Sequence, residues 1–270
     1  MKYWKIAMFI PIIVLLISAG FLGYRQTTEG KFIDLSIELK GGKLITVQVE
    51  TDLTASEIES QLQNANIRIS QGQNKVLMIE TSEDTNENEL LNSIKNVKII
   101  GEPTVNRVGS TLSEVFYQKA QQAVIIAFVL MAIVVFFLFR KIAPSIAVLF
   151  AGVMDIVVTF SVLSFLGVRL SLTIIAGLLM LIGYSIDSDI LLTTRVLKRK
   201  GKDIEERIKS SMKTGLTMTI TTLAALSAMY LFSTTPVIQT IAMVLIIGLL
   251  IDIPATYLTN VGILRLHLGE

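Results

Sequence analysis

Four aspartates lie within stretches of sequence that are otherwise almost wholly apolar. They are Asp155, Asp187, Asp189 and Asp252. A charged side chain at the centre of a membrane-spanning helix costs about 2.5–3.5 kcal/mol, so such a carboxyl group faces the protein interior or a wet cavity, or it is protonated. Because carboxyl groups take up and release protons, we interpret the four as candidates for proton coupling. The structural alternative, a hydrogen bond to backbone or hydroxyl groups, stays open for each.

The spacing of Asp187 and Asp189 predicts that their side chains point in different directions. Successive residues of an α-helix are turned by about 100°, so these two lie about 200° apart. Tyr184 shares the face of Asp187, whereas Ser185 and Thr193 share the face of Asp189. We therefore expect one carboxylate to serve a proton path and the other a different contact.

The other two aspartates belong to stripes of small and polar residues. The stripes are Gly152, Asp155 and Thr159, and Gly248, Asp252 and Thr256. Pro254 lies beside the second stripe and removes a helix hydrogen bond, which leaves polar backbone near the acid. Gly177 and Gly183 flank the acid pair and permit close helix approach. Both patterns fit acids that face the interior of a helical bundle.

Composition and hydropathy indicate a membrane protein. Of the 270 residues, 52% are hydrophobic and 17% charged, whereas soluble domains carry about 25% charged residues. Apolar runs of spanning length predict six transmembrane helices. Their predicted bounds are 6–24, 121–139, 144–166, 172–194, 216–233 and 237–260. The first run competes with a signal peptide, but a cleaved signal has an apolar core of about 7–15 residues, so we interpret it as an uncleaved anchor.

Positive charges are distributed unevenly between the two sides of the membrane. The short segments predicted on one side contain Lys2, Lys5, Arg140, Lys141, the basic run 198–213 and Arg265, and those on the other contain Arg169 alone. Cytoplasmic segments carry the excess of lysine and arginine. We therefore expect both termini and a loop at about 196–213 in the cytoplasm, in a multi-pass protein of the cell membrane, with residues 25–118 outside.

Segment 25–118 is predicted to fold as a domain outside the membrane. Alternation predicts strands at 43–50, 67–70, 75–81 and 97–105, and helical patterns occur at 54–65, capped by Thr54 or Ser56, and at 85–96. Strand–helix–strand thus occurs twice, which is the ferredoxin-like arrangement. The predicted fold is a membrane α-helical bundle with an α+β ferredoxin-like extracytoplasmic domain: the anchor is 1–24, the domain 25–118 and the remaining five spans 119–270.

Basic and hydroxyl side chains accompany the later spans. Arg195 and Lys213 lie near predicted cytoplasmic ends, where long side chains reach the interface, and we interpret both in this way. Residues 202–211 are predicted to form a short amphipathic connector helix. Threonines of the fifth span either bond to neighbouring helices or line a path for protons and water, and the sequence leaves both open. They are Thr214, Thr217, Thr219, Thr221 and Thr222.

Several functional classes have no pattern in this sequence. There is no cysteine, and the single histidine, His267, has no partner at metal-ligand spacing, so neither a metal nor a cofactor is predicted. Acids in several spans could indicate an intramembrane aspartyl protease, but its paired motif is missing and the large outer domain argues against it. No enzyme is therefore predicted. The net charge of +2 is too small to indicate nucleic-acid binding.

Three segments resemble one protein family. Residues 182–189 read Ile-Gly-Tyr-Ser-Ile-Asp-Ser-Asp and run on to Thr194-Arg195; residues 37–42 read Ile-Glu-Leu-Lys-Gly-Gly; residues 108–112 read Val-Gly-Ser-Thr-Leu. They are similar to the fourth-span signature, the Gly-Gly motif and the approach to the second span of the SecF family. This is the protein-export family SecD/SecF of the RND superfamily, here in an archaeal form. The motif residues are Gly41, Gly42, Gly183, Tyr184, Ser185 and Arg195.

The resemblance implies an accessory subunit of the Sec protein translocase. Such a subunit pairs with SecD in the lipid bilayer beside the Sec channel, assists the export of polypeptides and uses the proton-motive force. The bacterial acid of this family falls at Ser188, the acid of SecD at Asp187, and a bacterial arginine near Thr214. Lys213 beside it therefore joins the four aspartates as a proton-coupling candidate. The alternative is half of an RND-type small-molecule exporter that forms homodimers, and copurification of SecD would separate the two.

Overall fold

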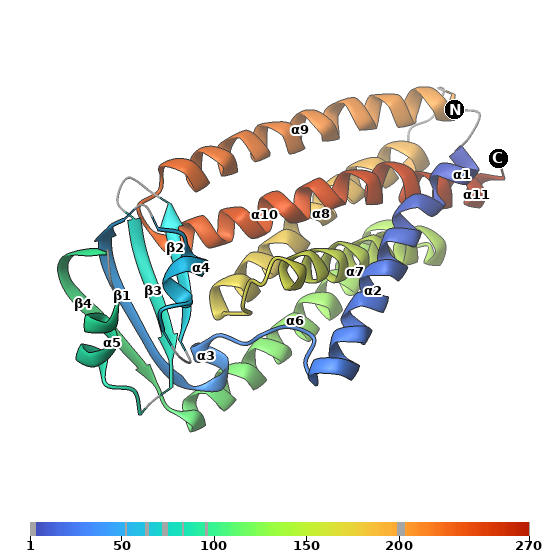
Figure 1. Ribbon diagram of the computed structural model, residues 1–270. Helices are drawn as coiled ribbons and strands as arrows, with labels where there is room; N and C mark the ends of the chain where they lie inside the picture. Colours follow the sequence, from blue (N-terminus) through green and yellow to red (C-terminus); the bar gives the residue numbers. More distant parts are fainter. Residues whose placement is uncertain are drawn as a thin grey trace.

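The structure is a computed structural model that describes residues 4–51, 53–62, 65–71, 75–82, 84–94, 97–198 and 203–269. Long helices form a bundle with a small sheet at one end, and the two ends of the chain lie together at the opposite end (Figure 1). Lys2 and part of the predicted loop 196–213 lie outside the described residues.

Among the residues that the structure describes, six segments are long and apolar enough to cross a membrane, which confirms the predicted number. Their helices are α1 (Trp4–Ala7) with α2 (Phe9–Glu29), α6 (Ser110–Phe139), α7 (Ile142–Phe165), α8 (Leu172–Lys198), α9 (Ile204–Phe232), and α10 (Pro236–Pro254), which continues through a π-helix, η1 (Ala255–Asn260), into α11 (Val261–Leu268). Each predicted span overlaps one of these helices or helix series, and the observed helices extend beyond the predicted bounds.

Two predicted ends are wrong. Residues 204–211 are not part of a separate connector helix, because α9 is continuous from Ile204 to Phe232, and the carboxylate of Asp203 accepts the Ile204 N–H at its start. The last span does not stop at residue 260. Pro254 has no N–H to donate, and the chain widens into the π-helix there and then resumes as α11.

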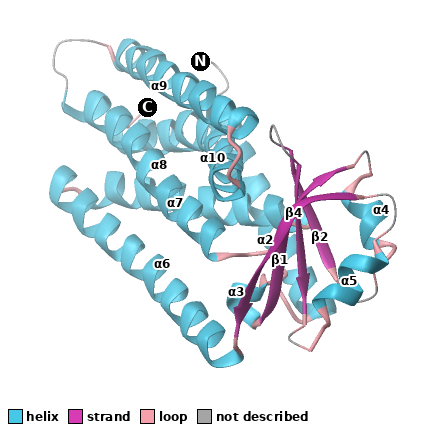
Figure 2. Cartoon of the chain, turned by 90° about the vertical axis from the view of Figure 1, so that its left-hand side faces the viewer, coloured by secondary structure: helices cyan, strands magenta, loops and turns pink. Residues whose placement is uncertain are grey.

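The sheet domain lies between α2 and α6 in sequence. It contains α3 (Ile37–Lys40), β1 (Gly42–Glu50), α4 (Ala55–Glu59), β2 (Asn66–Gln71), β3 (Lys75–Thr81), α5 (Glu87–Ser93) and β4 (Lys98–Val108). The strand order is β2-β3-β1-β4, and all neighbours are antiparallel (Figure 2). This order confirms the predicted ferredoxin-like fold.

The two domain helices are shorter than predicted. Thr54 is the cap of α4: its hydroxyl accepts the Glu57 N–H at 3.4 Å, while the Glu57 carboxylate accepts the Thr54 N–H at 2.7 Å. This reciprocal pair is a capping box. Both helices cover one face of the sheet, where alternate residues of β1 enter a shared apolar core that includes Ile45, Val47 and Ile58.

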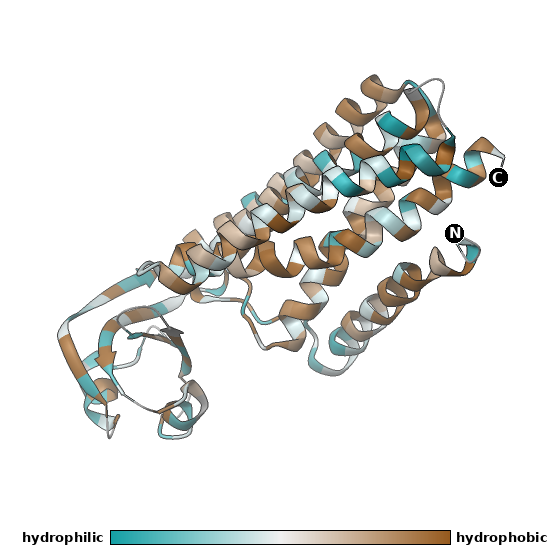
Figure 3. Ribbon diagram, turned by 90° about the horizontal axis from the view of Figure 1, so that it is seen from above, coloured by the Kyte–Doolittle hydropathy of each residue, from teal (hydrophilic) through white to brown (hydrophobic). Residues whose placement is uncertain are grey.

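Helix α8 packs against α7, α9 and α10, and α7 and α8 are the most buried spans. The spans α2, α6 and α9 instead expose large apolar side chains, among them Ile17, Phe137 and Ile220. Coloured by hydropathy, the helical bundle as a whole shows much brown (Figure 3). Such exposed apolar surface on helices of spanning length is typical of a protein whose solvent is lipid.

Candidate functional site

Three carboxyl groups from three different helices lie buried in the middle of the bundle. Asp155 of α7, Asp189 of α8 and Asp252 of α10 are at most 1% exposed. Asp252 lies close enough to Asp155 and to Asp189 for their charges to repel one another, so the three form one cluster. We call it the acid cluster. Burial of carboxyl groups at this depth is expensive unless they are hydrogen-bonded or protonated.

Serine hydroxyls of α8 hold the two acids contributed by its neighbours. The Ser185 hydroxyl donates to Asp155 Oδ2 at 2.5 Å, and the Ser188 hydroxyl lies 3.0 Å from Asp252 Oδ2. Ser188 also lies 2.8 Å from the Ser185 carbonyl, a second acceptor for its single proton. Helix α8 therefore bonds to α7 through Ser185 and to α10 through Ser188, three residues later.

Thr256 lies between Asp189 and Asp252. Its hydroxyl lies 2.9 Å from Asp189 Oδ1 and 3.1 Å from Asp252 Oδ1. A hydroxyl has one proton, so Thr256 donates to one carboxylate at a time. The Asn260 amide donates to Asp189 Oδ1 at 2.6 Å. Both residues belong to η1, so the π-helix that follows Pro254 supplies the partners of Asp189.

Some polar atoms of this region have no protein partner among the described residues. They are Asp155 Oδ1, Asp189 Oδ2, Thr159 Oγ1 and Thr193 Oγ1. Buried polar atoms are nearly always bonded, and the exceptions often mark functional sites or water. Within the described part of the chain, no lysine or arginine pairs with the three acids. In the described structure the three acids are thus held by hydroxyl and amide groups and not by basic side chains.

Glycines allow α8 and α10 to approach closely enough for these bonds. A Cβ on Gly248 would lie 2.3 Å from Leu181 Cδ2, and a Cβ on Gly177 would lie 3.1 Å from Val244. Leu181 is fully buried, so its side chain can move away from a new Cβ only by displacing its neighbours.

Gly248→Ala is therefore expected to force α8 and α10 apart and to destabilise the protein by about 1–3 kcal/mol, the usual cost of overpacking. Thermal unfolding of the purified protein measures this. Gly20→Ala is the matched control, because a Cβ there meets nothing within 4 Å. Equal melting temperatures for both variants would contradict the close approach.

Asp187 lies apart from the cluster. It is exposed on the outer face of α8, with Tyr184 and Gly183 on the same face, whereas Ser185, Asp189 and Thr193 are buried. The prediction that the two aspartates of α8 point in different directions is confirmed. An exposed carboxylate in the middle of a spanning helix is as costly as a buried one unless something polar covers it.

The sequence comparisons give the family. The family model described as protein export membrane protein SecD/SecF, C-terminal, matches residues 88–269. The protein-export membrane protein SecF of Pyrococcus furiosus is 38% identical over 96% of this chain and 90% of that protein. The SecF proteins of Methanocaldococcus jannaschii and Methanothermobacter thermautotrophicus are 35% and 41% identical, over 100% and 86% of this chain and 97% and 84% of theirs. The chain belongs to the SecF family.

Solved structures agree with this SecF fold. The SecDF crystal structure from Thermus thermophilus superposes with a TM-score of 0.80 at 18% identity, over 98% of this chain and 38% of that chain. A SecDF in a super-membrane-facing form superposes with a TM-score of 0.61 at 19% identity. The chain therefore has the fold of somewhat more than a third of SecDF.

The SecF motif residues occupy different places in the structure. Ser185 lies in the acid cluster, and Ser188, where the bacterial acid falls, bonds to Asp252. Gly183 and Tyr184 are on the exposed face of α8. Gly41 and Gly42 form the corner between α3 and β1, with φ of 86° and 133°. The motif residues thus lie at three separate places: in the acid cluster, on the exposed face of α8, and at the corner between α3 and β1.

The basic candidates do not join the acid cluster in the described structure. Lys213 is exposed on α9. Arg195 bonds to the neighbouring helix α9: its guanidinium donates to the Ser210 carbonyl at 2.7 Å and to the Thr214 hydroxyl at 2.9 Å. Its position at the membrane interface stays a prediction. The hydroxyls of Thr217 and Thr219 donate to the carbonyls four residues earlier in α9, so their hydrogen-bond acceptors lie within their own helix.

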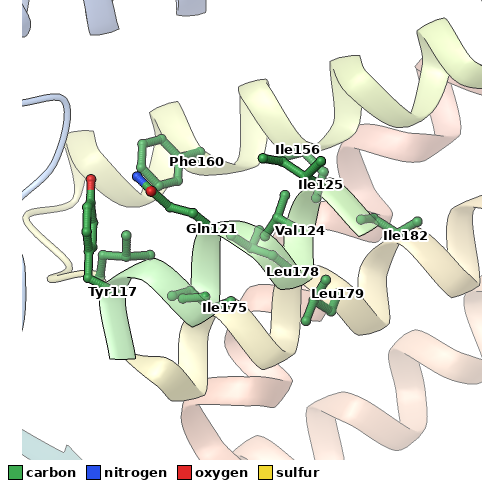
Figure 4. A pocket seen from close by; sticks show the side chains of 12 residues that line it. Tyr117, Gln121, Val124, Ile125, Ile156, Phe160, Ile175, Leu178, Leu179 and Ile182 are labelled. Carbon is green, nitrogen blue, oxygen red and sulfur yellow. The ribbon is translucent and has the colours of Figure 1, made fainter. Parts of the chain in front are cut away.

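An apolar pocket of about 520 Å³ lies between α6, α7 and α8. Figure 4 shows it lined by side chains such as Phe160, Leu178 and Val124, with Tyr117 and Gln121 toward one end. Among its lining residues there is no carboxyl group. The pocket therefore offers mainly hydrocarbon contacts, and Asp155, Asp189 and Asp252 are not among its lining residues.

Proposed function

We propose that this chain is an accessory subunit of the Sec protein translocase that promotes export of polypeptides across the cytoplasmic membrane. The main support is membership of the SecF family, whose relatives are named protein-export membrane proteins. The acid cluster in the middle of the spans supplies the physical means, since it is a group that can exchange protons inside the membrane.

We infer that SecD is its partner. The chain matches only 38% of the SecDF structure, so a comparable number of further spans is expected beside it. The exposed face of α8 with Gly183, Tyr184 and Asp187 is the best candidate for the contact. A partner helix with a polar or basic group there would remove the cost of a carboxylate that faces lipid.

The orientation follows from the charges. We propose that both termini and the segment 196–213, which includes the end of α8 and the start of α9, face the cytoplasm, where the basic residues gather. Both ends of the chain lie at the end of the bundle opposite the sheet (Figure 1). Residues 25–118 would then form the extracytoplasmic domain, between the anchor 1–24 and the membrane part 119–270, and would meet polypeptide that leaves the Sec channel.

We infer that a proton enters the acid cluster from outside and leaves it to the cytoplasm. Three ionised carboxylates in one dry cluster repel one another, and a proton on Asp189 or Asp252 relieves that repulsion. It also turns the acid into a donor, so Thr256 must direct its hydroxyl to the other carboxylate. One charge that crosses 100 mV supplies about 2.3 kcal/mol, enough to shift α10 against α8.

Copurification tests the partner. Gly183→Phe places a ring on the proposed contact face and is expected to reduce recovered SecD at least about tenfold, equivalent to about 1.4 kcal/mol of binding. Gly20→Phe is the matched control, since a Cβ at either glycine meets nothing within 4 Å of this chain. Full recovery of SecD with Gly183→Phe would contradict the proposed contact face and show that SecD binds another face of the chain.

Depletion of the chain tests the function itself. Membranes without it are expected to export a Sec-dependent polypeptide more slowly, and the wild-type chain should restore the rate. Unchanged export, together with self-dimers that contain no SecD, would instead support the small-molecule exporter.

A further inference from the structure

Glu80 is a buried acid at the end of β3, on the side of the domain that meets the membrane helices. It is 7% exposed and contacts two arginines at once. Its Oε1 lies 3.1 Å from Arg68 of the neighbouring strand β2, and its Oε2 lies 3.0 Å from Arg169. Arg169 lies in the turn between α7 and α8, three residues before α8 begins. One side chain therefore joins the sheet to the start of α8.

A second carboxylate of the domain bonds directly to that helix. Glu38 of α3 accepts the N–H of Leu172, the first residue of α8, at 2.8 Å. The first N–H groups of a helix have no partner within it, and the N-terminus attracts negative charge. Glu38 thus caps α8 from another domain.

The backbone forms a third connection. The Leu170 N–H donates to the Asp34 carbonyl at 2.7 Å, and the Ser36 N–H donates to the Leu170 carbonyl at 2.8 Å. These two bonds pair the segment before α3 with the α7–α8 turn as a short parallel bridge. All three connections meet within the turn that precedes α8.

The Gly-Gly motif allows these groups to meet. Gly42 has a φ of 133°, and a Cβ there would lie 2.6 Å from the carbonyl oxygen of Thr81, the residue after Glu80. Gly41 lies against the start of α6, 3.4 Å from the Cα of Ser110 when a Cβ is placed on it. The glycines therefore let α3 fit between the end of β3 and the outer ends of α6 and α8.

We propose that Glu80 is a positioning residue that, through Arg169, fixes the outer domain to α8, so that the domain and the helix that carries Asp189 move as one body. We call Glu80, Arg68, Arg169 and Glu38 the joint. The proposal deepens the proposed function, because Asp189 follows Leu172 by 17 residues, about 26 Å along one helix at 1.5 Å per residue. If α8 is displaced at the acid cluster, the sheet domain then moves with it, because the joint attaches the domain directly to the start of α8.

Spin-label distances test the joint in the full-length chain with its SecD partner in lipid nanodiscs. The sequence has no cysteine, so Ser93→Cys on α5 and Ala176→Cys on α8 provide a single pair of labels that reports the distance between the domain and α8. Both positions are exposed. We expect Glu80→Gln and Arg169→Gln each to widen the distance distribution about twofold, because either change breaks the ion pair between the sheet and the α7–α8 turn. Glu80→Gln also leaves Arg68 without its carboxylate, whereas Arg169→Gln leaves the pair of Glu80 with Arg68 in place. The double variant should be no wider than the single ones.

Three controls separate the joint from domain folding. Arg169→Gln lies outside the sheet domain, so the pairing of the strands does not depend on it. Arg169→Lys keeps the charge and should restore a narrow distribution. Glu50→Gln removes the same kind of side chain from an exposed pair with Lys98 in the same sheet and should change nothing.

Distributions as narrow as wild type in both Glu80→Gln and Arg169→Gln would overturn the proposal. Export rates of the same variants are a separate measurement. If the distributions widen while the export rate stays at the wild-type value, the joint holds the domain and the proposed role of its motion in export is what fails.

Discussion

Asp189→Asn is expected to remove the part of export that depends on the proton-motive force. The amide has nearly the shape of the carboxylate, and its oxygen can still accept from Thr256 and Asn260 at the positions of Asp189 Oδ1. Packing should therefore persist while titration is lost. Because each proton carries about 2.3 kcal/mol per 100 mV, we expect the export rate under an imposed gradient to fall roughly tenfold or more, to the rate without a gradient.

The measurement is export of one Sec-dependent polypeptide into membrane vesicles, with and without a proton gradient. Asp252→Asn should behave like Asp189→Asn, since the two acids share the hydroxyl of Thr256. Glu50→Gln is the control, because this exposed carboxylate lies in the sheet domain, away from both the acid cluster and the proposed contact face of α8. A gradient-dependent rate that survives in Asp189→Asn and Asp252→Asn would exclude the acid cluster as the coupling site.

Much of the fold was predictable because it follows from local periodicity. Apolar runs fixed the number of spans, and alternation along β1 and β3 identified the strands of the sheet. The opposite directions of Asp187 and Asp189 followed from 100° per residue alone. Each of these features depends on neighbours a few residues apart along the chain.

The membership of the acid cluster was only partly predictable, because it depends on contacts between helices. Asp155, Asp252 and Thr256 stood out as polar residues in apolar runs, whereas Asn260 gave no signal at the end of its span. Its contact with Asp189 requires the π-helix after Pro254. A π-turn holds more residues than 3.6 per turn, so the face of Asn260 cannot be read from α-helical spacing.

The residue at which α9 begins and the hydrogen-bond partners of Arg195 were not predicted, for a related reason. Polar residues at 202–211 predicted a separate connector helix, but residues 204–211 are the start of α9, where Arg195 of α8 bonds to Ser210 and Thr214. A long cationic side chain near a helix end is satisfied equally by headgroups or by a neighbouring helix. Only the position of α9 beside α8 decides between them.

Gly42→Ala is expected to be the most destabilising single-methyl change in the sheet domain. The new Cβ would lie 2.6 Å from the backbone oxygen of Thr81, which cannot rotate away as a side chain could, and the φ of 133° is itself unfavourable for alanine. Backbone strain and overpacking each cost about 1–3 kcal/mol. We therefore expect a loss of roughly 3 kcal/mol and a lower melting temperature of the purified protein.

Two other glycines separate the causes of that loss. Gly101→Ala at a φ of 87° introduces strain without a clash, since a Cβ there meets nothing within 4 Å, and Gly109→Ala introduces neither. The order of stability should be Gly109→Ala, then Gly101→Ala, then Gly42→Ala. If Gly42→Ala is no less stable than Gly101→Ala, the close approach of α3 to β3 is not required. If the order holds, the Gly-Gly motif is conformationally necessary because it brings Glu38 and Glu80 to the same helix end.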